Sequence, residues 1–385
     1  MTQQALPILP PAMLGILGGG QLGSMFTVAA KTMGYGVTVL DPDPHAPAAR
    51  FADRHLCAAF DDDKALAELE KCAAVTTEFE NVNAAAMREL ARHTRVSPSG
   101  DCVAVAQNRI TEKARMRAAG LQTVEYREIL SADDVDESCA ALLPAIVKTA
   151  TLGYDGKGQI RVKTLDEARA AFAGLGGVPC VLEQMADLRG EISVIVCRLD
   201  AQHAAAYDAA ENHHENGILA YSVVPARLPE NVQQQARQTA LHLAEALDYV
   251  GVLAVEMFVV GDDKRLLVNE IAPRPHNSGH HTIDACAASQ FQQQVRLMCG
   301  LPPADTRLHS PCCMANILGD VWGADGAQPC WTAVLDEAAA HLHLYGKKQA
   351  RAGRKMGHFT VLADDADAAF EAARAMRGKL PFHTP

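Results

Sequence analysis

The chain lacks the sequence features that define several classes of protein. Its 385 residues contain no apolar run long enough to span a bilayer, and the N-terminal MTQQALPILPPAM lacks the basic segment and apolar core of a signal peptide. The 11 cysteines have no CxxC spacing, and adjacent Cys312 and Cys313 suit neither a simple disulfide nor a zinc knuckle. The net charge of -11 argues against general nucleic-acid binding. We therefore expect a cytoplasmic protein with free, mostly buried thiols and neither a membrane nor a nucleic-acid partner.

The overall composition is that of a globular protein with more than one domain. Hydrophobic residues make up 49% of the chain and charged residues 21%, which is ordinary for a folded protein. A length of 385 residues exceeds one typical domain and predicts two or three. The sequence has no internal repeats and no low-complexity segment.

The N-terminal region has a βαβ pattern. An apolar strand is expected at Met13–Leu17, followed by the turn GGGQLG and a helix over Gln21–Met33. The strand GVTVLD then ends at Asp41, near the offset at which an acid contacts a ribose in dinucleotide-binding proteins. The turn fits G-x-G-x-x-G and favours NAD. However, strand-to-helix turns need glycine for their geometry and can bind any phosphate, so both interpretations stay open.

A second acidic segment, AAVTTEFENVN, places Glu78 and Glu80 just after an apolar run. They lie either in a solvated acidic loop or at the carboxyl end of a strand, where they would contact a ligand. A charged amphipathic helix is expected further on, from Asn108 to Ala119.

The segment GVLAVEMFVVGDDKRLLVNEI predicts a β-hairpin that turns at Gly-Asp-Asp-Lys. Pairing Val260 with Leu266 would place Glu256 opposite Glu270, with all four side chains on one face. Two opposed carboxylates among apolar neighbours repel unless a cation lies between them, and an oxygen-only ligand set favours Mg²⁺ or Mn²⁺ over Zn²⁺. The alternative is a slipped register with one glutamate in water. The same alternation points Asn269 to the other face.

The residues that follow, APRPHNSGHH, cannot be helical because of their two prolines. Arg274 therefore lies in an extended turn, where its guanidinium suits bidentate binding of phosphate or carboxylate. His276 is either an acid–base or polar contact, or a structural histidine. We reject zinc for His276, His280 and His281, because no cysteine or carboxylate nearby completes such a set.

A glycine-rich stretch, KTATLGYDGKGQIRV at residues 148–162, separates two predicted strands. It is not a Walker loop, because it does not lead into a helix. A hairpin flap of this kind can fold its backbone N–H groups over phosphates, and Lys148 at its entry can reach a phosphate as a point charge. Taken singly, the glycines could be turn residues and Lys148 a surface lysine.

Together these segments resemble the ATP-grasp enzymes, and among them the 5-(carboxyamino)imidazole ribonucleotide synthases of purine biosynthesis. The resemblance rests on IVKTATLGYDGKGQ, LEQM, ENHHENGIL, GVLAVEMF, VNEIAPRPHNSGHHT, ILGGGQLGSM, TEFENV and YGKKQARAGRKMGH. It spans about residues 12–362. One departure is Leu152, where the family more often has glycine.

The resemblance implies an α/β fold of ATP-grasp architecture. It divides the chain into an N-terminal Rossmann-like pre-ATP-grasp domain at residues 1–110 and an ATP-grasp domain at 111–300, whose lid subdomain covers about 115–185. A C-terminal domain at 301–385 would complete the ribonucleotide site.

The resemblance also implies a site for each ligand. The ATP site would comprise Arg109, Lys148, Gly153, Tyr154, Asp155, Gly156, Lys157, Gly158, Gln159, Glu183, Gln184, Met185, Ala186, Glu191, His214, Asn269 and Glu270. Mg²⁺ or Mn²⁺ would be held by Glu256 and Glu270. The ribonucleotide would contact Gln21, Leu22, Glu78, Asn277, Lys347, Arg354 and Lys355. The candidate catalytic residues are Asp155, Arg274 and His276.

The implied reaction consumes ATP, bicarbonate and 5-aminoimidazole ribonucleotide. Bicarbonate would attack the γ-phosphate to give carboxyphosphate and ADP, and the amine would take up the carboxyl group, giving N5-carboxyaminoimidazole ribonucleotide and phosphate. A homodimer is expected. The alternatives are a formate-dependent glycinamide ribonucleotide formyltransferase, another carboxylate–amine ligase, an NAD-dependent oxidoreductase and a nucleotide sensor without activity.

Overall fold

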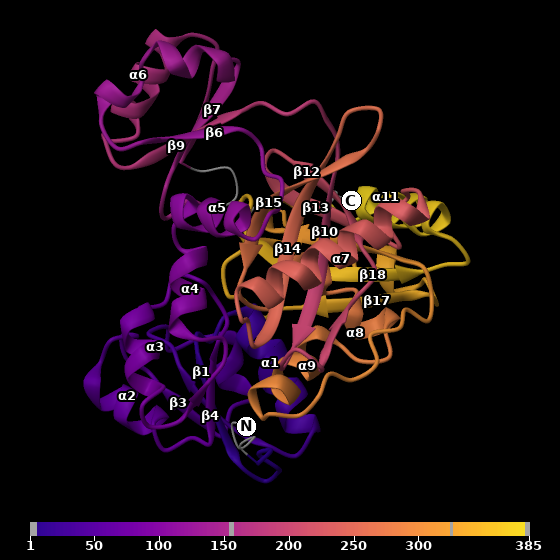
Figure 1. The fold of residues 1–385 in the computed structure, drawn as a ribbon. Coiled ribbons are helices and arrows are strands. Elements are labelled where there is room, and N and C mark those ends of the chain that lie inside the picture. The colour runs from indigo at the N-terminus through magenta and orange to yellow at the C-terminus, as the bar shows by residue number, and fades with distance from the viewer. Residues whose placement is uncertain (1–5, 154–157, 324–325, 382–385) are drawn as a thin grey trace.

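The computed structural model describes residues 6–153, 158–323 and 326–381, which form three β-sheets (Figure 1). The N-terminal sheet is parallel, with strand order β3-β2-β1-β4-β5. Its strands are β1 (Met13–Leu17), β2 (Gly36–Leu40), β3 (Arg54–Leu56), β4 (Ala74–Thr77) and β5 (Arg95–Val96). The helices of this region are α1 (Gln21–Thr32), η1 (Pro47–Arg50), α2 (Asp63–Leu69), α3 (Ala84–Leu90) and α4 (Gly100–Ala106). The predicted βαβ opening is confirmed.

A small antiparallel sheet of order β6-β9-β7-β8 stands apart from the rest of the molecule, at the upper left of Figure 1. The helix α5 (Arg109–Ala118), capped by Asn108, precedes it, as the sequence predicts. The region of the small sheet comprises β6 (Tyr126–Ile129), η2 (Ala132–Asp134), η3 (Glu137–Leu142), β7 (Ala145–Thr149), β8 (Gln159–Val162), α6 (Leu165–Gly174) and β9 (Cys180–Gln184). The glycine-rich stretch thus connects two paired strands, β7 and β8.

The large sheet has nine strands, in the order β15-β14-β10-β12-β13-β16-β18-β17, with β11 on β10. They are β10 (Leu188–Arg198), β11 (Ala204–Ala206), β12 (Ala210–Glu215), β13 (Ile218–Val224), β14 (Gly251–Val260), β15 (Arg265–Ala272), β16 (Cys312–Leu318), β17 (Ala340–Leu344) and β18 (Lys355–Leu362). Associated helices are α7 (Glu230–Ala246), η4 (Asn277–Gly279), α8 (Thr282–Ala285), α9 (Gln290–Met298), η5 (Gly319–Val321), α10 (Thr332–Leu335) and α11 (Ala366–Lys379).

The helix α9 joins the N-terminal sheet to the large sheet. Phe291, Val295 and Met298 of α9 are buried in one apolar cluster with Ile16 and Val39 of the parallel sheet. Burial of each large apolar side chain contributes about 1.5–3 kcal/mol to the stability of the folded protein. This packing therefore fixes the position of the two sheets relative to each other. The carboxyl ends of β1 and β4 thereby reach the same cavity as β14 and β15.

The predicted β14–β15 hairpin forms, but its register is only partly as expected. Glu256 pairs with Glu270, as predicted, whereas Val260 pairs with Arg265 rather than with Leu266. A β-bulge after Glu256 causes the difference, and it turns Leu266 into the apolar core on the other side of the sheet. A bulge places two residues opposite one, so regular alternation fails beyond it.

All 11 cysteines lie in the described part of the chain and are free, and all but Cys57 and Cys330 are buried, as the sequence predicts. Among the described residues, no helix is both long enough and apolar enough to cross a membrane.

Candidate active site

A cavity of about 950 Å³ lies where residues from all three sheets converge. The predicted site residues that line it are Gln21, Leu22, Glu78, Arg109, Lys148, Gly153, Gln159, Glu191, His214, Glu256, Asn269, Glu270, Arg274, His276, Asn277 and Lys355. Contacts predicted separately for a nucleotide, a metal and a second substrate therefore share one chamber.

The paired residues Glu256 and Glu270 both line this cavity. Because of the bulge, Asn269 also lines the cavity, so the expectation that it points to the other face is wrong. The Oδ1 atom of Asn269 is buried and has no hydrogen-bond partner. Two carboxylates and an amide oxygen in need of a partner form the oxygen donor set that Mg²⁺ prefers, so these residues fit the predicted metal.

Each carboxylate of the pair has a cationic or imidazole neighbour. The Arg109 guanidinium donates from Nη1 to Glu270 Oε2 at 2.8 Å, and His276 Nε2 lies 3.0 Å from Glu256 Oε1. Burial opposes the ionisation of Glu270, but Arg109 and Lys148 more than offset this and lower its pKa. Glu270 is therefore an anion at neutral pH, as a metal ligand must be.

A buried ion-pair triad supports the entry to the glycine-rich stretch. Glu183 accepts from Lys148 at 2.6 Å and lies 2.9 Å from the ammonium nitrogen of Lys113, whose side chain is fully buried. Burial raises the pKa of Glu183, but the two lysines outweigh it and lower the pKa to about 2. Glu183 therefore positions Lys148 through its side chain.

The sequence interpretation missed Glu112 and Lys113. Both lie on the helix that begins at Arg109, and spacings of three and four residues place all three side chains on neighbouring positions of one helical face. Glu112 accepts a hydrogen bond from the backbone N–H of Ile271 at 2.7 Å and so fixes β15 at the residue that follows Glu270. Burial, with the charge of Glu270, raises the pKa of Glu112 to about 8. The helical spacing in NRITEK was the signal that could have identified them.

Arg274 reaches across the cavity to the N-terminal region. Its Nε donates to Glu80 Oε2 at 2.6 Å, and its Nη1 donates to the carbonyl of Pro275. Burial raises the pKa of Glu80, but Arg274 overcomes this and lowers it to about 2. Glu80 therefore lines the cavity rather than lying in a solvated acidic loop, and a ligand contact of Glu78 or Glu80 stays a prediction.

Two further lining residues form a pair, because His214 Nδ1 lies 3.0 Å from Glu191 Oε2. The two residues come from β12 and β10, and a bulge between His213 and His214 shifts the register at this point. Burial lowers the pKa of His214, but Glu191 raises it by more, so the net pKa is above its ordinary value.

The backbone N–H groups of the glycine turn after β1 already have side-chain partners. The backbone N–H groups of Gly20 and Gly23 donate to the carboxylate of Glu78, the latter at 2.6 Å, and that of Gly19 donates to Asp41 at 2.7 Å. A Cβ on Gly23 would lie 2.5 Å from the backbone oxygen of Gly18, so glycine is required at that position of the turn. Side-chain carboxylates thus occupy the donors that a dinucleotide pyrophosphate would need, which contradicts the NAD interpretation.

The three predicted basic contacts to the ribonucleotide lie on and beside β18. Lys355 lines the cavity, Lys347 donates to the carbonyl of Lys355 at 2.8 Å, and Arg354 donates to that of Gln349 at 2.8 Å. Burial and the charge of Arg354 lower the pKa of Lys347 to about 8. Asn277 lines the cavity with both side-chain polar atoms buried and without partners, as expected of a group that a ligand completes.

The predicted ATP contacts that directly follow Glu183 do not line the main cavity. Gln184 and Ala186 line a second cavity of about 450 Å³, and the side chain of Met185 is partly exposed. Tyr154, Asp155, Gly156 and Lys157 lie outside the described residues. At the edges of that gap, Gly158 and Leu152 have φ of +73° and +62°. The left-handed backbone explains why glycine suits position 152.

Three domain families match consecutive parts of the chain. The ribonucleotide synthetase preATP-grasp domain matches residues 12–107, the ATP-grasp domain 114–291, and the phosphoribosylaminoimidazole carboxylase C-terminal domain 312–372.

Whole-length relatives agree with this. The N5-carboxyaminoimidazole ribonucleotide synthase of Brucella melitensis is 46% identical over 359 residues, covering 91% of this chain and 96% of the relative. That of Bacillus subtilis is 41% identical over 362 residues, covering 94% of each chain.

The chain belongs to the N5-carboxyaminoimidazole ribonucleotide synthase family.

Solved structures of N5-carboxyaminoimidazole ribonucleotide synthases share the fold. That from Thermus thermophilus has a TM-score of 0.88 and 37% identity, covering 97% of this chain and 100% of that chain. The Aspergillus clavatus enzyme, solved with ADP and 5-aminoimidazole ribonucleotide, has a TM-score of 0.85 and 31% identity, covering 95% and 97%. The ATP-grasp architecture expected from the sequence is confirmed. Members of this family are ADP-forming ligases, so the interpretations of the chain as an oxidoreductase or as a sensor without activity are wrong.

Proposed function

We propose that this chain carboxylates 5-aminoimidazole ribonucleotide with bicarbonate at the expense of ATP, giving N5-carboxyaminoimidazole ribonucleotide, ADP and phosphate. This is the reaction of purine biosynthesis for which its relatives are named. The observation that carries the proposal is the shared cavity. It brings the Glu256–Glu270 pair and the unpartnered Asn269 Oδ1 together with Lys148, Arg109 and the N-terminal region.

Three of the cations that line the cavity lie against carboxylates. Arg109 pairs with Glu270, Lys148 with Glu183, and Arg274 with Glu80. These partners keep the cationic side chains in place without requiring a bound ligand. Phosphoryl transfer needs placement and charge neutralisation more than covalent help, and preorganised cations supply both.

Mg²⁺, held by Glu256 and Glu270 with Asn269 beside them, would neutralise phosphate charge during transfer. Glu112 and Arg109 position Glu270 for that role, one through the backbone of β15 and one by direct pairing. His276 beside Glu256 is placed to accept or hand on a proton at Nε2.

Arg274 is the residue we assign to bicarbonate. Its Nε and Nη1 are held by Glu80 and the Pro275 carbonyl, so its orientation is determined before any anion arrives. A planar guanidinium can present parallel N–H groups to the two oxygens of bicarbonate, as the point charge of a lysine cannot. Carboxyphosphate, the proposed intermediate, is hydrolysed readily in water, so an enclosed chamber favours its transfer to the amine.

The ribonucleotide would lie between the glycine turn and β18. Gln21, Leu22 and Asn277 line this part of the cavity, and Lys355 lies on β18. Lys347 and Arg354 supply further positive charge for its single phosphate.

The proposal is tested by following labelled carbon from bicarbonate to the ribonucleotide. With ¹³C-labelled bicarbonate, ATP, Mg²⁺ and 5-aminoimidazole ribonucleotide, we expect a new ¹³C carbamate signal that appears in step with ADP. The same mixture with glycinamide ribonucleotide and formate should give no product. ADP formed without label in the ribonucleotide would contradict the assignment.

The homodimer and the cytoplasmic location belong to the same proposal, and they rest on the family resemblance. Sedimentation equilibrium of the purified chain tests the first, since a monomer at micromolar concentration would contradict it. Cell fractionation against a cytoplasmic marker tests the second.

A further inference from the structure

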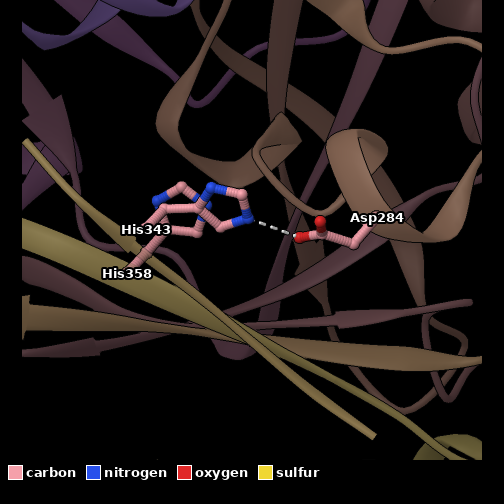
Figure 2. A group of neighbouring side chains, drawn as sticks. All are labelled: Asp284, His343 and His358. Carbon is pink, nitrogen blue, oxygen red and sulfur yellow. Dashed lines mark hydrogen bonds and ion pairs between the residues drawn. The ribbon is translucent and has the colours of Figure 1, made fainter. Parts of the chain in front are cut away.

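A cluster of potential metal ligands lies among residues that the proposed reaction does not use. Asp284, His343 and His358 each offer a ligand atom, and these atoms lie within 4.8 Å of one another (Figure 2). Asp284 lies on the short helix α8, and the histidines lie on β17 and β18. None of the three lines the 950 Å³ cavity, so this cluster is separate from the carboxylate pair described above.

The strand register explains the meeting of the two histidines. His343 pairs directly with His358 in the antiparallel β17–β18 ladder, so both side chains leave the same face of the sheet. Their rings stack with centroids 4.6 Å apart. His343 Nε2 lies 2.9 Å from Asp284 Oδ2, drawn as the dashed line in Figure 2. Three segments of the chain thus bring potential ligand atoms to within 4.8 Å of one another.

His358 is the member that a simple ion pair does not explain. It is fully buried, and its Nε2 has no hydrogen-bond partner. Its other nitrogen, Nδ1, is 2.9 Å from the hydroxyl of Tyr345. With Tyr345 accepting the Nδ1 proton, Nε2 carries a lone pair, which is the tautomer a metal ligand requires. An unpartnered buried nitrogen is costly, and a bound cation would satisfy it.

The side chain of Asp284 is 9% exposed and that of His343 29%, so the cluster is largely enclosed but open to ions from one side. His341 Nδ1, 3.9 Å from Asp284 Oδ1, lies close enough to add a fourth ligand.

We propose that Asp284, His343 and His358 form a binding site for a divalent transition-metal ion of the Zn²⁺ class. Two imidazoles and one carboxylate, with a fourth position for water or His341, are a ligand set that zinc accepts. Ligands of one tetrahedral zinc ion lie about 3.4 Å apart. His343 Nε2 and Asp284 Oδ2, which are 2.9 Å apart, would therefore separate slightly, and the His358 ring would turn toward them.

Such an ion would brace the part of the C-terminal region that carries the basic residues. His343 precedes Lys347 by four residues, and His358 follows Lys355 by three. The ion would tie both strands to α8 and so fix the position of those lysines. The role is structural and distinct from that of Mg²⁺ in the main cavity.

Cobalt substitution tests the site in the intact protein. The protein is stripped with chelator and titrated with Co²⁺ in excess Mg²⁺, which occupies the carboxylate site. We expect one Co²⁺ per chain with the visible absorption of imidazole-ligated, four-coordinate cobalt, displaced by one equivalent of Zn²⁺. The variants Asp284→Asn and His343→Gln should bind at least roughly 10-fold more weakly, whereas the exposed control His242→Gln should match the wild type.

A second readout separates binding from misfolding. In chelator, Asp284→Asn should melt close to the wild type, because asparagine preserves the shape of the side chain. Adding Zn²⁺ should raise the melting temperature of the wild type by mass action, with a much smaller rise for Asp284→Asn. A wild type without the cobalt absorption, or equal metal binding by wild type, Asp284→Asn and His343→Gln, would overturn the site.

Discussion

At the scale of single residues, Glu256 and Glu270 differ in their partners, and we propose that they share the task of holding Mg²⁺. Glu270 is held by Arg109, and Glu256 lies beside His276. Because each glutamate has a neighbour of its own, repulsion within the pair is relieved without a metal, and replacing one glutamate should not stabilise the free protein. Replacing either glutamate should instead lower the turnover rate.

We expect Glu256→Gln and Glu270→Gln each to reduce turnover by about 100-fold or more, since each removes one charge from a preorganised site. Steady-state ADP release across a Mg²⁺ titration is the measurement. Glu245→Gln, an exposed position on α7, is the matched control and should be unaffected. Wild-type rates in both active-site variants at low millimolar Mg²⁺ would refute the metal assignment.

The pKa of Lys347 predicts how binding of the ribonucleotide depends on pH. Burial and Arg354 lower its pKa to about 8, so the side chain is charged below that pH and neutral above it. The KM for 5-aminoimidazole ribonucleotide should therefore increase as the pH rises through about 8. The loss of a charge-assisted hydrogen bond corresponds to roughly 10-fold or more in binding.

Lys347→Arg provides the internal control for that profile, because arginine stays charged throughout this range. In this variant the increase in KM should disappear. An unchanged pH dependence in Lys347→Arg would assign the titration to another group.

At the scale of elements, much of the architecture was predictable. The βαβ opening, the helix after Asn108 and the β14–β15 hairpin follow from hydrophobic periodicity, caps and turn residues, which are local signals. The opposition of Glu256 and Glu270 was predictable for the same reason. The bulge that brings Asn269 beside them was not, because it depends on packing against both faces of the sheet.

Contacts between elements that are far apart in the sequence account for the site residues that local sequence patterns did not predict. Glu183 of β9 meets Lys113 of α5 and Lys148 of β7, and no spacing rule links those positions. Likewise, the acidic partner of His343 is Asp284, 59 residues earlier in the chain. The basic residues near β18 were identified only through the family resemblance.

The Glu183 triad predicts a specific acid sensitivity. Its folded-state pKa is about 2 against an ordinary value of 4.5, so the stabilisation is fully present above pH 4.5 and is lost as the pH falls toward 2. At 1.36 kcal/mol per unit, it is on the order of 3 kcal/mol. Lys113→Met removes one of the two cations and should raise the pH at which acid unfolding occurs.

Urea unfolding at a series of pH values measures this effect. Lys64→Met, at an exposed position on α2, is the control and should follow the wild type. If Lys113→Met and wild type lose stability over the same pH window, the triad does not hold Glu183 in its charged form.

At the scale of the whole molecule, we propose that two ends of the cavity bind different substrates. The end near β7 and α5 carries Lys148 and Arg109, and the end near β18 carries Lys355 with Lys347 and Arg354 nearby. Lys148→Ala should raise the KM for ATP with a smaller effect on the ribonucleotide, and Arg354→Ala should do the reverse. Each effect should be about 10-fold or more, as for a lost charge-assisted hydrogen bond. Steady-state kinetics with each substrate varied in turn decide this, and equal effects of both variants on both substrates would contradict two separate ends.

The central claim is that bicarbonate is the species activated by ATP. The most direct measurement is ADP release with 5-aminoimidazole ribonucleotide in degassed buffer, with bicarbonate titrated from near zero, for the wild type and Arg274→Lys. We predict a wild-type rate that rises from near zero to saturation. Arg274→Lys should bind ATP normally but turn over about 100-fold or more slowly, as expected when one preorganised electrostatic group is lost. A wild-type rate that is indifferent to bicarbonate, or one that appears only with formate and glycinamide ribonucleotide, would contradict the account.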